Sequence, residues 1–235
     1  TLSLDGGKTL ISTEDMPSFE DNIWSLYLSN TGVSKFSGTQ LPKMLAGKHV
    51  SVTPYISNIR HGLNGQCAPK DIETAFQLMY LYFTDPRFDA DEYATGSQQI
   101  KAVLPNLQNN PQFKFQRAVN ETLYANNPRV VNLDETVLEK ASLETLKKVY
   151  TEQLFKDAAG ATLTVVGNVD LETLKPMVEK YIGSLPKGKK AAGINEDNLI
   201  SMAKGEVNND VKVSMQTPKK TVFQVHSGYM PIDTK

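Results

Sequence analysis

Three histidines, His49, His61 and His226, are the residues of this chain best suited to bind a metal ion or move a proton near neutral pH. Hydrolytic zinc needs three protein ligands and an open position for water. Helical ligand pairs stand four residues apart, but Thr53 follows His49 at that spacing and Asn64 stands three residues after His61. We therefore assign no metal-binding residue, and we expect His49 at a strand start, His61 in a hairpin turn and His226 at a strand end. The alternative is a site assembled by folding from distant residues, which the types and spacing that zinc requires support poorly.

Two further features could carry chemistry, but each lacks the neighbours that its chemistry requires. Cys67 is the single cysteine, so it forms no disulfide within the chain, and no Cys-His signature surrounds it. We expect it to be a small strand residue. Residues 6–9 (Gly-Gly-Lys-Thr) resemble the end of a phosphate-binding loop, but the loop's first glycine is missing, so we interpret them as a turn. With no G-x-S-x-G sequence either, we assign no catalytic and no cofactor-binding residue.

The charge of the chain is balanced, with a formal net charge of −1. A dedicated nucleic-acid binder would show a basic excess, so we predict no nucleic-acid partner. The most basic stretch, residues 187–190, has no aromatic neighbours and is interpreted as a solvated linker. The carboxylates of residues 85–92 are interpreted as a helix start, where negative charge is favoured. No apolar run reaches the roughly 18 residues that a membrane span needs, and we predict no span in this segment.

Hydrophobic periodicity indicates the elements that would position any site. We expect a short strand and a Gly-Gly turn in residues 1–12, a strand over 50–56, a turn at 60–65 that returns through 66–67, and a continuous apolar strand over 161–166. We expect helices over 18–30 with Ser18 as the cap, after Ser37, from Asp71 to 84, over 89–104 with Pro105 as the stop, over 112–123, from Ser142, and over 171–181 around Pro176. This order predicts an α+β fold, a two-layer sandwich of a mostly antiparallel sheet with helices packed on one face.

Composition divides the chain into three parts. Residues 1–187 are expected to form one α/β domain. Residues 188–210 lack periodicity and are rich in Lys, Gly, Asn and Asp, which is typical of a linker. Residues 211–235 contain two alternating apolar runs around Thr217-Pro218, and we expect a β-hairpin that opens the next domain. The sequence begins at Thr1 like the interior of a longer gene product, so the absence of a targeting signal gives no information on location.

Three segments, in order, resemble the insulinase/pitrilysin family of zinc metallopeptidases. Residues 32–48 resemble its "G-x-G-x-F … L-A-G-K" stretch. Residues 71–87 are similar to its "dle-x-a-x-q-L … f-t-x-P-r" helix, and residues 163–186 to its "v-G-n-v-d … Y-i-g-s-L-P" ending. The resemblance covers about residues 4–186, and it is the order and spacing of the segments that make it specific.

In that family four similar domains form two halves that close around a peptide, and zinc is held by an H-x-x-E-H on the first domain and a glutamate on a later helix. The resemblance places the corresponding helix here at residues 18–30, which contain no histidine. It places the later helix where Gln98 and Gln99 stand. The Leu45-Ala46-Gly47-Lys48 sequence is typical of the third domain, in the non-catalytic half.

The resemblance therefore implies a non-catalytic domain of a larger zinc metalloendopeptidase, inactive alone, that forms part of a peptide-enclosing chamber and the interface to the catalytic half. Its expected partners are the catalytic half of the same polypeptide and a peptide or protein substrate. Zinc is expected in the catalytic domain of the parent and no cofactor in this chain. The suspected location is a bacterial periplasm or cell envelope. Two alternatives remain open: an enzyme-dead structural subunit, and a peptide-binding module that uses an exposed strand edge.

Overall fold

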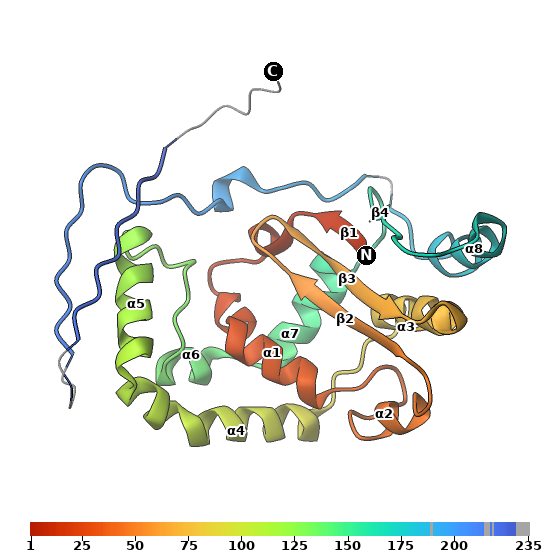
Figure 1. Ribbon diagram of the computed structural model, residues 1–235, viewed down its shortest axis with the longest axis horizontal. Coiled ribbons are helices and arrows are strands. Elements are labelled where there is room, and N and C mark those ends of the chain that lie inside the picture. The colour runs from red at the N-terminus through yellow and green to blue at the C-terminus, as the bar shows by residue number, and fades with distance from the viewer. Residues whose placement is uncertain (189, 214–216, 218, 229–235) are drawn as a thin grey trace.

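The computed structural model describes residues 1–188, 190–213, 217 and 219–228, and it is built around a four-stranded antiparallel sheet (Figure 1). The strands lie in the order β2-β3-β1-β4. They are β1 (Leu2–Asp5), β2 (Val50–Ile56), β3 (Arg60–Cys67) and β4 (Thr162–Leu163). The prediction of an α+β fold with an antiparallel sheet is confirmed.

The sheet has one buried and one exposed face, as strict alternation along each strand requires. Leu63 stands opposite Leu2 on β1 and opposite Pro54 on β2, and all three side chains are buried. Val52 extends the same face. The prediction of a half-buried strand over residues 50–56 is therefore confirmed.

Helices cover the buried face and extend beyond it. Their bounds are α1 (Asp21–Asn30), α2 (Gln40–Met44), α3 (Ile72–Thr84), α4 (Ala90–Asn109), α5 (Pro111–Leu123), α6 (Glu135–Lys140), α7 (Leu143–Val149) and α8 (Leu171–Met177). Side chains of α1, α3 and α7 join the sheet in the main core. A second, smaller core lies between α1, α4 and α6. Figure 1 shows α4 and α5 forming an arm on the side opposite α8.

The ends of two helices differ from the prediction. Glu20, not Ser18, caps α1, because its carboxylate accepts hydrogen bonds from the backbone N–H groups of Asn22 and Ile23. Ser18 lies in a preceding 3₁₀ turn (Met16–Phe19). Pro105 does not stop α4, which continues to Asn109. Leu104 before this proline is 2% exposed, and packing of this kind can offset one lost backbone hydrogen bond.

Two strand predictions were wrong. The turn of the β2–β3 hairpin lies at residues 57–59, and the predicted turn at 60–65 is the first part of β3. Its glycines serve close packing: a Cβ at Gly62 would stand 1.9 Å from the carbonyl oxygen of Leu2. The predicted strand over 161–166 contracts to Thr162–Leu163, and Val166 is 93% exposed.

Part of the predicted linker is held against the domain. Asn198 donates a side-chain hydrogen bond to the carbonyl oxygen of Thr9 (2.7 Å). The buried Arg129 donates to the carbonyl oxygens of Asn198 (3.1 Å), Lys8 (2.7 Å) and Ile11 (2.9 Å). Arg129 therefore fixes the segment near Asn198 to the 3₁₀ turn η1 (Gly7–Leu10).

The division of the chain at residues 187 and 210 remains a prediction. In the predicted hairpin, residues 211–213 and 219–228 carry no strand assignment, and residues 214–216, 218 and 229–235 lie outside the described residues. Helix α6 is an element that hydrophobic periodicity did not indicate, because it has only six residues.

Candidate functional site

Helix α1 is the element in which the resemblance places two zinc-binding histidines, and here its inner face carries aromatic and aliphatic packing. Ile23, Trp24 and Tyr27 are its buried residues. The Tyr27 hydroxyl donates a hydrogen bond to the carbonyl oxygen of Arg87 (2.5 Å). Burial raises the pKa of Tyr27 above that of a free tyrosine, so the hydroxyl remains a proton donor. The inner face of α1 therefore packs against the core and presents no histidine that could bind zinc.

Helix α4 is the element in which the resemblance places the distal glutamate, and it packs directly on α1. Gln98 and Gln99 are both exposed, and Gln99 accepts a hydrogen bond from the side chain of Asn30 (3.4 Å). Gly96 is buried at the contact, where an added Cβ would lie 3.7 Å from the carbonyl oxygen of Leu26. Within the described parts of the chain, no group of three or more His, Cys, Asp or Glu residues could hold a metal ion.

The acidic residues at the start of α4 form a structural network, as a helix start predicts. Asp89 caps α4 through the backbone N–H groups of Asp91 and Glu92. Arg87 donates to both carboxylate oxygens of Glu92 (3.1 Å each) and to Asp89 (2.6 Å). Glu92 also accepts from the backbone N–H of Gly38 (3.1 Å). The carboxylates of Asp89 and Glu92 thus each have local structural partners.

His61 occupies the interior of β3, not a turn, and its expected position was wrong. It is 1% exposed. Its Nε2 donates to the carbonyl oxygen of Leu154 (2.5 Å), and its Nδ1 accepts from the backbone N–H of Gly7 (3.2 Å). Burial lowers its pKa, which favours the neutral ring that these two bonds require. Both ring nitrogens are therefore engaged, and neither is available to a metal.

The other candidates are exposed. His49 directly precedes β2, as predicted, and its backbone N–H donates to Asp71 (2.9 Å). His226 shares a hydrogen bond with Gln224 (3.1 Å). Cys67 ends β3, as predicted for a strand residue, and its pKa is raised by partial burial and by the charge of Asp71. A raised pKa lowers the fraction of reactive thiolate, so Cys67 has no feature of an activated nucleophile.

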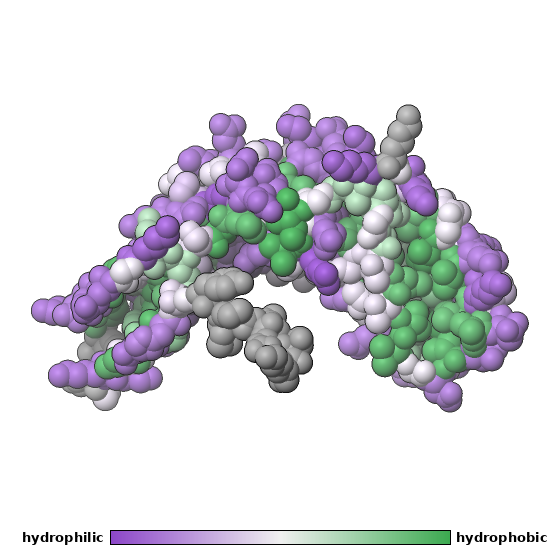
Figure 2. All heavy atoms as spheres, turned by 90° about the horizontal axis from the view of Figure 1, so that it is seen from above, coloured by the Kyte–Doolittle hydropathy of each residue, from purple (hydrophilic) through white to green (hydrophobic). Residues whose placement is uncertain are grey.

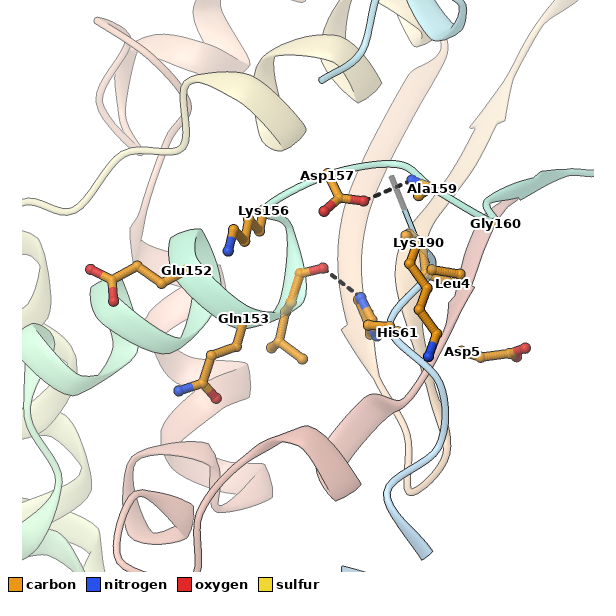
Figure 3. Close-up of a pocket in the computed structure, with 13 residues that line it drawn as sticks. Leu4, Asp5, His61, Glu152, Gln153, Lys156, Asp157, Ala159, Gly160 and Lys190 are labelled. Atoms are coloured by element: carbon orange, nitrogen blue, oxygen red, sulfur yellow. Dashed lines mark hydrogen bonds between the residues drawn. The ribbon is translucent and has the colours of Figure 1, made fainter. Parts of the chain in front are cut away.

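A cavity of about 260 Å³ lies beside His61, between the ends of β1 and β3, the π-helical turn Tyr150–Leu154 and the segment that follows residue 189. Figure 3 shows charged side chains of both signs around it, among them Asp5, Lys156 and Lys190. The His61 ring points to the Leu154 carbonyl and not into the cavity as a free base. The cavity therefore has the residues to hold a small polar molecule but no nucleophile paired with a base.

The exposed face of the sheet carries mostly uncharged polar groups, and we call it the polar sheet face. Its hydroxyl and amide side chains are Ser3, Ser51, Thr53, Tyr55, Asn64 and Gln66. The charged residues on this face, Asp5 and Arg60, stand at its hairpin end and form an ion pair with each other (3.3 Å). Tyr55 donates to Ser3 (2.9 Å), and Thr1 donates to Asn64 (3.2 Å). Such groups can form hydrogen bonds with a peptide of any charge.

Comparison with known proteins shows which proteins this chain is similar to. Residues 140–227 match the family described as "Peptidase M16 inactive domain". The chain is 26% identical over 158 residues to the probable zinc protease PqqL of Escherichia coli, and 29% identical over 134 residues to a "Zinc protease PQQL-like" of Arabidopsis thaliana. The chain is homologous to the M16 zinc proteases. The resemblance to a zinc metallopeptidase family is thereby confirmed.

Solved structures of M16-like proteases have the same fold. The crystal structure of the periplasmic protease PqqL from E. coli superimposes with a TM-score of 0.65 at 22% identity and covers 86% of this chain. A protease from Helicobacter pylori gives a TM-score of 0.62 at 14% identity, also over 86% of this chain. The M16 relatives are much longer: the matches span 17% and 14% of the two curated sequences and 22% of the PqqL structure.

Proposed function

We propose that this chain is a non-catalytic part of a longer zinc metalloendopeptidase, in which it forms one wall of a peptide-enclosing chamber and contacts the catalytic half. The observation that carries the proposal is the match of residues 140–227 to the inactive domain of M16 peptidases. The α1–α4 pair supports it, because packing residues on α1 and the amides Gln98 and Gln99 on α4 stand where the resemblance places the metal ligands of a catalytic domain.

The polar sheet face is the surface that we assign to the chamber. A chamber that admits varied peptides needs hydrogen-bonding groups without a fixed charge, since an unpaired buried charge would reject many sequences. The face offers alternating hydroxyl and amide groups on a rigid sheet, and Ser51, Thr53, Asn64 and Gln66 are exposed.

Zinc belongs, in this proposal, to the catalytic half, where it would polarise the peptide carbonyl and activate water. This chain would supply peptide contacts and enclosure. We place the parent protein in the bacterial periplasm, with support from the periplasmic location stated for the E. coli PqqL structure. Among the described residues, no helix is long and apolar enough to cross a membrane.

Peptide hydrolysis by two preparations tests the proposal: the 235-residue chain and the full-length gene product that contains it. We expect the chain alone to leave a fluorogenic peptide library intact with added zinc, and the full-length product to cleave it and to lose activity with a chelator. A full-length product that lacks an H-x-x-E-H sequence and zinc-dependent cleavage would favour the enzyme-dead subunit instead.

A substitution on the polar sheet face tests the chamber assignment. We expect Thr53→Arg in the full-length product to raise KM for basic peptides several-fold through like-charge repulsion, with a smaller change for acidic peptides. Gln98→Arg is the matched control, because Gln98 is exposed on α4, away from the sheet. Equal effects of the two substitutions on KM would contradict the assignment.

A further inference from the structure

Strand β4 forms one edge of the sheet, and its outer side is unpaired among the described residues. Thr1 and Thr164 exchange two hydrogen bonds of 2.8 Å, one from each backbone nitrogen to the other residue's carbonyl oxygen. In an antiparallel pair the direction of the backbone groups alternates with each residue. Leu163 and Val165 therefore turn their N–H and C=O groups toward the free edge.

The opposite edge of the sheet is protected, and this one is not. Strand β2 carries Pro54 at its centre. Ser57 and Arg60 form the hydrogen-bonded pair that closes the hairpin. The direction of the backbone groups alternates along β2 from that pair, so the nitrogen of Pro54 faces the outer edge. Proline has no N–H, and the outer edge therefore lacks a hydrogen-bond donor at this position. Natural sheets use proline, charged residues and bulges to prevent unwanted pairing at edges. Residues 161–166 (Ala-Thr-Leu-Thr-Val-Val) contain no proline and no charge.

Uncovered apolar side chains continue from this edge. Val165 is 39% exposed, Val166 93% and Leu171 70%. Helix α8, which follows β4, has no buried residue. Figure 2 shows hydrophobic residues gathered on the surface at the end of the molecule where α3 and α8 lie. A free strand edge beside such side chains has the features of an incomplete sheet.

We infer that the free edge of β4 receives a further β-strand of the same longer polypeptide, from outside residues 1–235, which also covers Val166 and Leu171. The inference rests on the proposed function, in which the chain is part of a longer protein. The matched relatives have several times the length of this chain, so most of their sequence lies outside the matched part. Thr1 pairs with Thr164 on the inner side of β4, so polypeptide joined at Thr1 would begin one strand away from this edge.

Hydrogen exchange measured by mass spectrometry tests the pairing. In the 235-residue chain at low concentration we expect the Leu163 and Val165 amides to exchange at nearly the rate of free peptides. In the full-length gene product we expect exchange at least 100-fold slower. Free exchange in both preparations would overturn the inference. Protection in the 235-residue chain that increases with protein concentration would also overturn it, because a second copy would then be the occupant.

A charge at the edge gives an independent readout. We expect Val166→Asp to leave the melting temperature of the 235-residue chain unchanged and to lower that of the full-length product by several degrees. Val166→Thr, which keeps the β-branched shape, should restore most of that loss. Val207→Asp is the control, because Val207 is 51% exposed and outside the sheet. Equal tolerance of Val166→Asp and Val207→Asp in the full-length product would contradict the inference.

The two proposals fail in different ways. A full-length product that cleaves peptides with zinc while its β4 amides exchange freely would remove the inference and leave the proposed function standing. A longer product with protected β4 amides but no zinc-dependent cleavage would remove the proposed function and leave the pairing. A gene product that ends at residue 235 would remove both.

Discussion

Helix α3 is the first α-helix after the hairpin strand β3, and helix α8 is the first after the edge strand β4. The two helices differ in how many of their side chains are buried. Helix α3 places Ala75, Phe76, Leu78, Met79 and Phe83 in the core. Helix α8 buries no residue. The difference extends to the chain around them, because Leu185 is the only buried hydrophobic residue after Ala159 among those described.

An amphipathic pattern therefore indicates which face of a helix must be buried. It does not indicate whether the residues that bury that face lie in the same part of the sequence. Residues 2–159 contain both the amphipathic helices and the residues that bury their apolar faces. Residues 160–185 contain the pattern, and their apolar side chains at Val166 and Leu171 remain exposed. Substitutions in the two regions can show whether this difference in burial is also a difference in stability.

The largest effect is expected from Leu146→Ala on α7. Leu146 is 0% exposed in the main core. Removing a fully buried leucine leaves a cavity, and we expect the free energy of unfolding to fall by about 2–5 kcal/mol. Urea denaturation followed by circular dichroism measures it. A loss comparable to that of an exposed residue would show that the main core is not packed as described.

A smaller but more specific effect is expected from Arg129→Met. The change removes the donors to the carbonyl oxygens of Lys8, Ile11 and Asn198, and the Ile11 oxygen loses its hydrogen bond in a buried position, so we expect a loss of about 2–3 kcal/mol. Trypsin should also cleave after Lys190 faster than in the unsubstituted chain. Arg117→Met is the control, because Arg117 is 40% exposed and forms surface ion pairs. Unchanged cleavage would show that Arg129 does not hold this segment.

A pH effect is expected from His61. Its folded-state pKa is lowered by burial, so below the unfolded value of about 6.5 the unfolded chain binds more protons than the folded one. Stability should therefore fall as the pH drops through about 6.5, by at most about 1.4 kcal/mol per pH unit until the folded ring is itself protonated. Melting temperatures from pH 7.5 to 5 measure the slope. His61→Gln should flatten the slope and His49→Gln should not; the reverse result would assign the effect to His49.

The smallest effect is expected from Leu171→Ser on α8. Leu171 is 70% exposed, and substitutions at such positions usually change stability by less than about 0.5 kcal/mol. A loss of 2 kcal/mol or more in the 235-residue chain would mean that α8 is covered in solution. That result would remove the contrast between α3 and α8.

Local patterns predicted the elements whose cause is local. The alternation of residues 50–56 predicted β2, Ser142 predicted the cap of α7, and the apolar face from Asp71 predicted α3. These features depend on neighbours within one turn or one strand.

Features that depend on distant residues were not predicted. Gly62 is a glycine because the backbone of β1 approaches it, and α4 passes through Pro105 where Leu104 is buried against other helices. Arg129 stands in a loop after Pro128, and nothing in its sequence neighbours signals four acceptors from two remote segments. The polar sheet face was half predicted: Ser51, Thr53 and Tyr55 were assigned to one face, but β3 was interpreted as a turn.

The Arg129 contacts also have a mechanical consequence. A force applied to the chain beyond residue 198 would be transmitted through the Arg129 side chain and Asn198 to η1, and from there to β1 beside it. The backbone between Leu185 and Asn195 would carry little tension until those hydrogen bonds broke. In a single-molecule pulling experiment the hydrogen bonds of Asn209 to Thr122 and of Ala203 to Leu123 should break first, and the next rupture should occur at the Arg129 side chain while the sheet is still intact.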